Sequence, residues 1–141
     1  MKGGILIVED NPVHARLLEM TLGAEGYSLL RATDGEQALD IATRERPDLV
    51  LMDLNLPGMT GFEVTKKLRK LPGLSQTPII ALTAYAMRGD REKAIEAGCD
   101  GYISKPIDTR QLPAIVAEML RRGKDSSSLS EDDNGEENPC N

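Results

Sequence analysis

Short apolar runs recur along this chain, and each of them ends in a polar or charged residue. Ile5–Val8, Leu49–Met52 and Ile79–Leu82 are unbroken stretches of Ile, Leu, Val, Met and Ala. Such runs are typical of strands that are covered on both faces. Helical patterns separate them, so that strand and helix alternate five times along the chain. This alternation predicts right-handed crossovers and a parallel sheet.

The helices have recognisable starts and stops. Asn11 followed by Pro12 predicts the start of a first helix, and Gly26 and Gly98 predict helix ends. Three pairs have the spacing of a capping box, namely Asp34 with Gln37, Thr60 with Glu63, and Asp108 with Gln111. The last helix has one apolar face, made by Leu112, Ile115, Val116, Met119 and Leu120. The fourth helix, about residues 87–97, has few apolar residues, and we expect it to be weakly anchored.

Composition and charge divide the chain in two. The 141 residues, 40% of them hydrophobic, suffice for one domain with a sizeable core. Of the net charge of −6, residues 123–141 contribute −5, from six acids and one lysine. We therefore expect a folded domain over residues 1–122 and an acidic, disordered tail over residues 123–141. The domain is close to neutral, which argues against sequence-independent binding to nucleic acid.

The cysteines and the apolar runs indicate the compartment. The chain has two cysteines, Cys99 and Cys140, and the second lies in the polar tail. A disulfide is therefore not expected, and a reducing cytoplasm fits this cysteine usage. No apolar run approaches the ~18 residues that span a membrane, and the start of the chain lacks the pattern of a signal peptide. We expect no association with a membrane.

The residues that end the strands are the candidate functional residues. Glu9 and Asp10 follow the first strand, Asp53 ends a central strand, Thr83 ends the next, and Lys105 follows the last. If the strands are parallel, these residues meet at the edge where open α/β sheets bind ligands. Three crowded carboxylates repel one another and attract a cation, and Mg²⁺ prefers such oxygen ligands. Asp53 is then a candidate nucleophile toward a phosphoryl group, with Lys105 and Thr83 offering a positive charge and a hydroxyl to the phosphate.

Other polar residues have simpler interpretations. His14, the only histidine, lies in a polar helical turn and is expected to be solvated. Cys99 is expected to be a small buried residue. Lys105 precedes Pro106, and a cis peptide bond at such a position would direct the lysine side chain. A basic run on the third helix is interpreted as a solvated face; it consists of Lys66, Lys67, Arg69 and Lys70.

Four motifs occur together in a characteristic order, namely Ile7–Asn11, Asp48–Asp53 with Pro57–Gly61, Leu82–Ala84, and Lys105-Pro106. In these motifs the chain resembles the receiver domains of two-component response regulators, from about Lys2 to Arg121. Two longer stretches, Ala81–Asp90 and Gly98–Ile107, are most similar to single-domain regulators of the bacterial cell cycle of the DivK type. The resemblance implies a CheY-like, flavodoxin-like (βα)5 doubly wound fold with a five-stranded parallel sheet in the order 2-1-3-4-5.

The resemblance also implies a role for each site residue. Asp53 would accept a phosphoryl group from a histidine kinase or a histidine phosphotransfer protein. Thr83 and Lys105 would contact the phosphate, and Tyr102 would change rotamer together with Thr83 as a switch. The implied Mg²⁺ ligands are Glu9, Asp10, Asp53 and the backbone carbonyl of Asn55. Such a protein is not an enzyme acting on other substrates, because it catalyses only its own Mg²⁺-dependent phosphorylation and dephosphorylation.

Two other functions compete with this one. A haloacid-dehalogenase-type phosphatase also uses an aspartyl nucleophile, but it has a second aspartate two residues later, where this chain has Asn55. An interaction domain that has lost phosphorylation would not need an acid, a hydroxyl and a lysine at one site. We expect no output domain after the receiver, so the signal would leave through protein contacts. The expected output surface comprises the fourth helix, fifth strand and fifth helix, beside Thr83 and Tyr102.

Overall fold

The computed structural model describes residues 3–83 and 89–129, and for residues 90 and 123–129 it describes the backbone alone. Five parallel strands form one sheet in the order β2-β1-β3-β4-β5, as predicted. The strands are β1 (Gly4–Val8), β2 (Ser28–Ala32), β3 (Leu49–Asp53), β4 (Ile79–Thr83) and β5 (Gly101–Ser104). The helices are α1 (Pro12–Gly23), α2 (Gly35–Glu45), α3 (Gly61–Arg69), α4 (Asp90–Ala97) and α5 (Leu112–Leu129).

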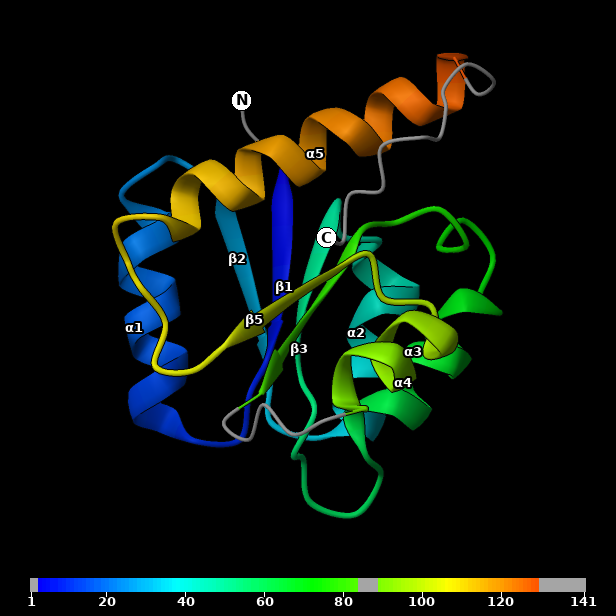
Figure 1. Ribbon diagram of the computed structural model, residues 1–141, viewed down its shortest axis with the longest axis horizontal. Coiled ribbons are helices and arrows are strands. Elements are labelled where there is room, and N and C mark those ends of the chain that lie inside the picture. The colour runs from blue at the N-terminus through cyan, green and yellow to red at the C-terminus, as the bar shows by residue number, and fades with distance from the viewer. Residues whose placement is uncertain (1–2, 84–88, 130–141) are drawn as a thin grey trace.

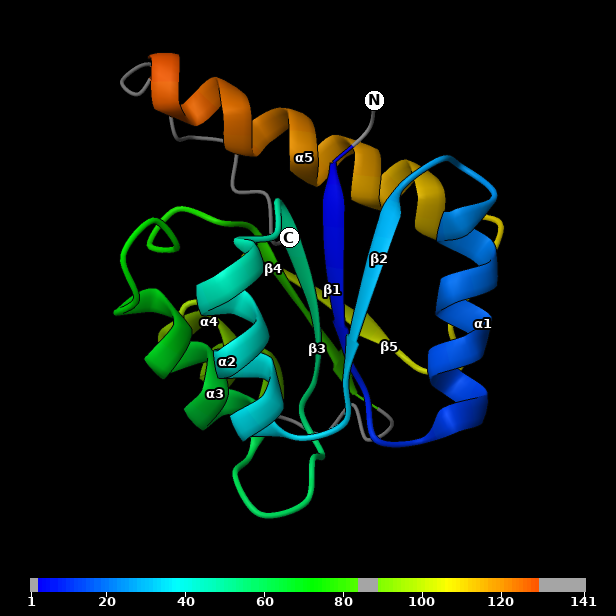
Figure 2. The same ribbon diagram turned by 180° about the vertical axis from the view of Figure 1, so that it is seen from behind.

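Helices cover both faces of the sheet. Helices α1 and α5 lie on one face, and α2, α3 and α4 lie on the other (Figures 1 and 2). Alternate residues of the inner strands point to opposite faces. In β1, Ile5 and Ile7 pack with residues of α1 and α5, whereas Leu6 and Val8 pack with residues of α2, α3 and α4. All four side chains are fully buried, which explains why the inner strands are unbroken apolar runs.

Capping residues fix the helices that begin beside the carboxyl ends of the strands. The Asn11 side chain accepts hydrogen bonds from two backbone N–H groups at the start of α1. Thr60 and Glu63 form the predicted capping box of α3, and Asp34 caps α2. Asp108 differs from the prediction, because its side chain accepts the N–H of Arg110 instead. The sequence therefore positions three of the loops that surround the sheet edge.

Two helices end at positions other than those predicted. Helix α1 ends at Gly23, and Gly26 lies in the turn that follows, with a φ of 96°. Helix α5 continues to Leu129, whereas the sequence predicted a disordered tail from residue 123 onward. Each residue added to a helix contributes a further hydrogen bond, and no proline interrupts the chain after Pro113 until Pro139. Residues 130–141 and the predicted start of α4 at Met87 lie outside the described residues.

Arg69 is a structural residue, so the interpretation of the basic run as a solvated face is wrong at this position. Its guanidinium donates to the backbone carbonyls of Gly98 and Thr77 and pairs with Asp100 at 2.7 Å. These contacts join the end of α3 to the end of α4 and to the loop before β4. The remaining members of the run are exposed, as predicted; they are Lys66, Lys67 and Lys70.

Candidate functional site

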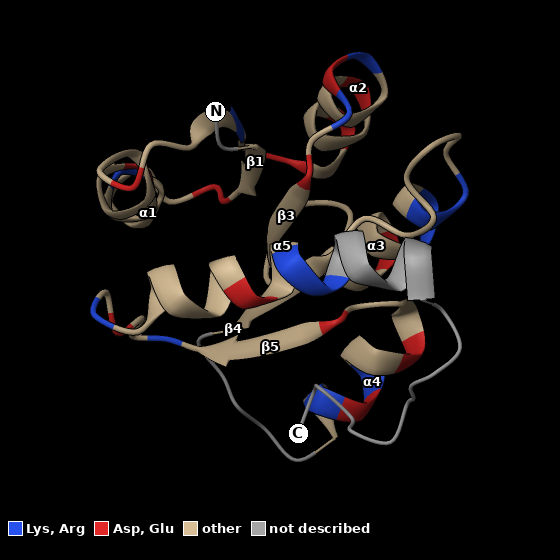
Figure 3. Cartoon of the chain, turned by 90° about the horizontal axis from the view of Figure 1, so that it is seen from above, with Lys and Arg blue, Asp and Glu red and all other residues tan. Residues whose placement is uncertain are grey.

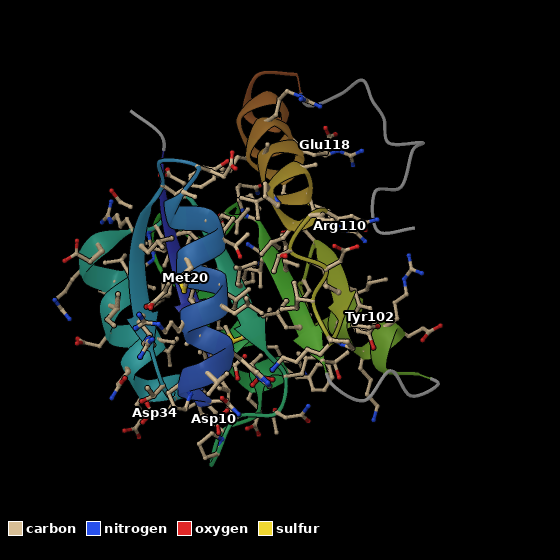
Figure 4. All side chains as sticks on the ribbon, turned by 90° about the vertical axis from the view of Figure 1, so that its left-hand side faces the viewer. Asp10, Met20, Asp34, Tyr102, Arg110 and Glu118 are labelled. Atoms are coloured by element: carbon tan, nitrogen blue, oxygen red, sulfur yellow. The ribbon has the colours of Figure 1, made fainter. Side chains whose placement is uncertain are left out.

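The carboxyl ends of β1 and β3 bring three carboxylates together, as predicted. These strand ends point toward the lower edge of the molecule in Figure 1. Glu9 and Asp53 are only 1% and 3% exposed, whereas Asp10 is exposed. One oxygen of each carboxylate lies within 4.8 Å of the others. Figure 4 shows Asp10 at the same end of the molecule as Asp34, the cap of α2.

The loop after β3 fixes the position of Asp53. Its Oδ1 accepts the backbone N–H of Asn55 at 2.9 Å, so the Asn55 backbone borders the site. The backbone carbonyl of Asp53 lies against Gly61, where a Cβ atom would collide with it. Glycine therefore allows α3 to begin directly against this loop. The role of the Asn55 carbonyl as a metal ligand remains a prediction.

Lys105 lies between the two buried carboxylates. Its Nζ donates to Glu9 Oε1 at 2.9 Å and lies 3.6 Å from Asp53 Oδ2. Its backbone N–H donates to the carbonyl of Thr83 at 2.7 Å, which holds the ends of β4 and β5 together. The peptide bond between Lys105 and Pro106 is cis. Sequence reasoning thus placed this lysine correctly beside the acids.

Thr83 lies on β4, the strand next to that of Asp53, and Tyr102 lies on β5, one strand further out. Asp53 pairs with Leu82 on β4, so Thr83 is one residue beyond it at the strand end, and it is buried. On β5, Tyr102 pairs with Ala81 and is half-buried. Figure 4 shows Tyr102 on β5, near α4. The roles of the two residues in phosphate contact and in switching remain predictions.

His14 is the site residue that the sequence analysis missed. Its Nδ1 lies 3.2 Å from Lys105 Nζ and 3.8 Å from Glu9 Oε2, although 44% of its side chain is exposed. The sequence predicted a solvated histidine, and this prediction is wrong for the Nδ1 atom, which contacts Lys105. One signal was available in the sequence, because the first turn of a helix that follows Glu9 and Asp10 must lie at the same sheet edge.

The site carries excess negative charge, and this affects Glu9. Burial raises the pKa of Glu9 from its ordinary value of 4.5 to about 7, and the charge of Asp53 adds to this effect. The hydrogen bond from Lys105 lowers the pKa of Glu9 and offsets part of the increase. The cluster thus contains three carboxylates, and of these the Lys105 ammonium contacts Glu9 and Asp53, an arrangement that favours the binding of an additional cation.

Glu9 is expected to make the protein less stable as the pH rises. Below pH 4.5 both folded and unfolded Glu9 are protonated, and between 4.5 and about 7 only the folded state keeps the proton. The free energy of unfolding therefore loses about 3 kcal/mol from this group over that window, and the loss is complete above it. Urea denaturation of the wild type and of Glu9→Gln in metal-free buffer measures the effect. Parallel stability curves for the two proteins from pH 4.5 to 7.5 would contradict it.

A family comparison identifies the kind of domain. The sequence model of the family described as response regulator receiver domain matches residues 5–117 of this chain. This chain belongs to the response regulator receiver family. It is 47% identical over 120 residues to the polar-differentiation response regulator DivK of Brucella anthropi, a match that covers 85% of this chain and 98% of that protein. The DivK protein of Brucella abortus is 46% identical with the same coverage.

Solved receiver structures have the same fold. A CheY-like receiver domain protein from Methanospirillum hungatei has a TM-score of 0.83 at 30% identity, over 89% of this chain and 99% of that one. The receiver domain of a sensor histidine kinase from Pseudomonas aeruginosa has a TM-score of 0.80 at 39% identity, over 86% and 99%. In that structure a magnesium ion is coordinated in the active site cleft.

Family membership defines the general function of this receiver. It is homologous to DivK and to CheY-like single-domain response regulators, and it acts in two-component signalling. Receiver domains of this family interact with histidine kinases or phosphotransfer proteins and with downstream targets. Within residues 3–83 and 89–129, no helix combines the length and the apolar character needed to cross a bilayer.

Proposed function

We propose that this receiver accepts a phosphoryl group on Asp53 and transmits the signal through protein contacts. The geometry around Asp53 carries the proposal. Its carboxylate is 3% exposed at the end of β3, lies 3.6 Å from the Lys105 ammonium and shares a cluster with two more carboxylates. A nucleophile, a balancing cation and a metal-ligand set therefore occupy one edge of the sheet.

The Asp53 carboxylate is suited to attack a phosphohistidine. As the new O–P bond forms, the P–N bond of the donor breaks, and its electron pair stays on the donor imidazole. No proton has to leave Asp53, because an ionised carboxylate is already nucleophilic. Lys105 balances charge on the phosphoryl oxygens, and the Thr83 hydroxyl donates to one of them. Hydrolysis reverses phosphorylation: water attacks the phosphorus, the O–P bond to Asp53 breaks and leaves the carboxylate, and inorganic phosphate and a proton are released.

The carboxylate cluster fits Mg²⁺, which takes hard oxygen ligands and keeps several waters. We assign Glu9, Asp10, Asp53 and the Asn55 carbonyl as the residues that hold the ion. When bound, Mg²⁺ neutralises charge on the transferring phosphoryl group. The magnesium ion in the Pseudomonas aeruginosa receiver supports this assignment.

Phosphorylation by a small-molecule donor tests the proposed function. The wild-type protein, incubated with acetyl phosphate and Mg²⁺, is expected to gain the mass of one phosphate, measured on the intact protein. In excess EDTA the gain is expected to disappear, because the crowded carboxylates then repel the incoming anion. Undiminished labelling in EDTA would refute the requirement for the metal, and no labelling with Mg²⁺ would refute the function.

The exposed apolar row of α1 supports a docking surface for the phosphodonor protein. Helix α1 buries Ala15, Leu18 and Leu22 and leaves Val13, Leu17 and Met20 exposed, with 72%, 41% and 63% of each residue accessible. Figure 4 shows Met20 on this helix. The row begins beside His14, at the edge that carries Asp53. A donor that packs on the row can therefore reach the phosphorylation site.

We propose the α4–β5–α5 face as the output surface. The N-cap of α4 is Gly89, which offers no side-chain hydrogen bond, and Ile95 on this helix is 45% exposed. Tyr102 is half-buried on the adjoining strand. A helix with so few anchoring contacts moves at low energetic cost. The near-neutral domain makes a protein a better candidate target than nucleic acid.

We also propose that residues 1–122 form the receiver and that residues 123–141 are dispensable for phosphorylation. Figure 3 shows basic residues on α5 just before residue 123. Residues 123–141, which follow them, carry a net charge of −5. A protein ending at Arg122 is expected to keep its melting temperature and its labelling rate in high salt, because salt screens the tail charge. A large loss of stability on truncation would show that the tail packs on the domain.

The cysteine usage of the sequence supports a reducing compartment for this receiver, because there are only two cysteines and one of them lies in the polar stretch 123–141. Cys99 is buried beside the Thr65 hydroxyl, as expected for a small core residue. We propose the cytoplasm as the place where it acts.

A further inference from the structure

The Lys105 ammonium has three neighbours that can accept a hydrogen bond, and one of them is not a carboxylate. Its three N–H donors face Glu9 Oε1 at 2.9 Å, His14 Nδ1 at 3.2 Å and Asp53 Oδ2 at 3.6 Å. An ammonium has no lone pair, so in a hydrogen bond between the two groups His14 Nδ1 is the acceptor.

The two carboxylate neighbours are the groups that phosphorylation changes. Under the proposed function, Glu9 becomes a metal ligand and Asp53 becomes an acyl phosphate. The atoms that these two residues present to Lys105 therefore change during the reaction. His14 takes no part in either change, so its contact with Lys105 can persist throughout the reaction.

Helix α1 holds His14 in place independently of Lys105. The His14 backbone N–H donates to Asn11 Oδ1 at 3.2 Å, within the cap that starts the helix. The ring is 44% exposed and belongs to neither core cluster. Replacement of this side chain should therefore disturb the site without unfolding the domain.

We propose that His14 is a positioning residue that keeps the Lys105 ammonium at the sheet edge while the phosphoryl group arrives and leaves. The proposal rests on the proposed function, because Lys105 acts there on the phosphoryl group of Asp53. Without His14, the lysine side chain gains rotamer freedom and spends less time in the reactive position. Both phosphorylation and hydrolysis of the acyl phosphate slow as a result.

Three variants separate this role from a structural one. His14→Asn places an amide oxygen close to the position of Nδ1, whereas His14→Leu removes the acceptor at similar size. Arg16→Leu, at an exposed position of the same helix, is the matched control. With acetyl phosphate and Mg²⁺, His14→Leu is expected to be labelled about 3- to 10-fold more slowly, because water replaces part of the lost contact. His14→Asn and Arg16→Leu are expected to stay within about twofold of the wild type.

A second readout does not depend on phosphorylation. In proteins labelled with ¹⁵N at lysine, the Lys105 ammonium is expected to give a signal in slow exchange with water. Lys105→Arg identifies the signal. It should disappear in His14→Leu and return in His14→Asn.

The outcomes distinguish this inference from the proposed function. If the wild type is labelled and His14→Leu is labelled equally fast, the role of His14 is wrong while the function of Asp53 stands. If His14→Asn and His14→Leu are both labelled equally slowly, the proposed role of His14 is also wrong, because a hydrogen-bond acceptor at position 14 would then have no effect on the rate. Failure of the wild type to be labelled would reject the proposed function, and the role of His14 with it.

Discussion

Asp53→Asn is expected to abolish the incorporation of phosphate. The amide of asparagine is a far weaker nucleophile than a carboxylate, and Asp53 is a buried member of the metal-ligand cluster with the Lys105 ammonium at 3.6 Å. The wild type and the variant are incubated with acetyl phosphate and Mg²⁺, and the mass of each intact protein is followed with time. The fold should survive, because the substitution preserves size and relieves repulsion among the carboxylates.

Asp40→Asn is the matched control for this substitution. Asp40 lies on α2 with 68% of its side chain exposed, and its ion pair is to Arg44 on the same helix. An exposed pair of this kind contributes little to stability, so this variant should be labelled at the wild-type rate. If Asp53→Asn incorporates more than a trace of phosphate, and this phosphate has the lability of an acyl phosphate, the phosphoacceptor is a residue other than Asp53.

Thr83→Ala is expected to leave phosphorylation possible and to abolish the conformational response. Thr83 is buried at the end of β4, and β5, which carries Tyr102, is its neighbour in the sheet. Under the proposed function the Thr83 hydroxyl donates to the phosphate, so its removal is expected to eliminate a contact that favours the active state. The equilibrium between the two states then shifts little on phosphorylation.

The response is measured by NMR with beryllofluoride as the phosphate mimic. In the wild type, the mimic should shift the signals of Tyr102 and the neighbouring residues of β5, and in Thr83→Ala these shifts should be largely lost. Ser104→Ala is the control, because Ser104 pairs with Thr83 in the sheet but is exposed. Wild-type shifts around Tyr102 in Thr83→Ala would contradict a role for Thr83 in the switch.

The sequence predicted which residues meet at one edge of the sheet because of parallel strand geometry. Parallel strands share one carboxyl edge, so each residue that ends an apolar run must lie near the others, whatever the helices between them do. Glu9, Asp53, Thr83 and Lys105 all follow or end such runs, and the structure brings them to that edge. The bounds of β1, β3 and β5 follow the runs for the same reason.

Other features depend on contacts that local patterns do not encode. β2 is an edge strand in which only Ala32 is buried, so it lacks the apolar run by which the inner strands were located. Arg69 resembled the lysines around it, yet it reaches carbonyls that are distant in sequence. His14 has a polar helical environment, and its significance arises from Lys105, 91 residues later in the chain.

The most direct test of the account is to locate the phosphate. The wild type is phosphorylated with acetyl phosphate and Mg²⁺ and reduced at once with borohydride, which converts an aspartyl phosphate to homoserine. The protein is then digested and its peptides are sequenced by mass spectrometry. Homoserine is expected at position 53 and at no other position. Homoserine at Asp10 or at any other aspartate, with Asp53 unchanged, would contradict the assignment of Asp53 as the phosphoacceptor.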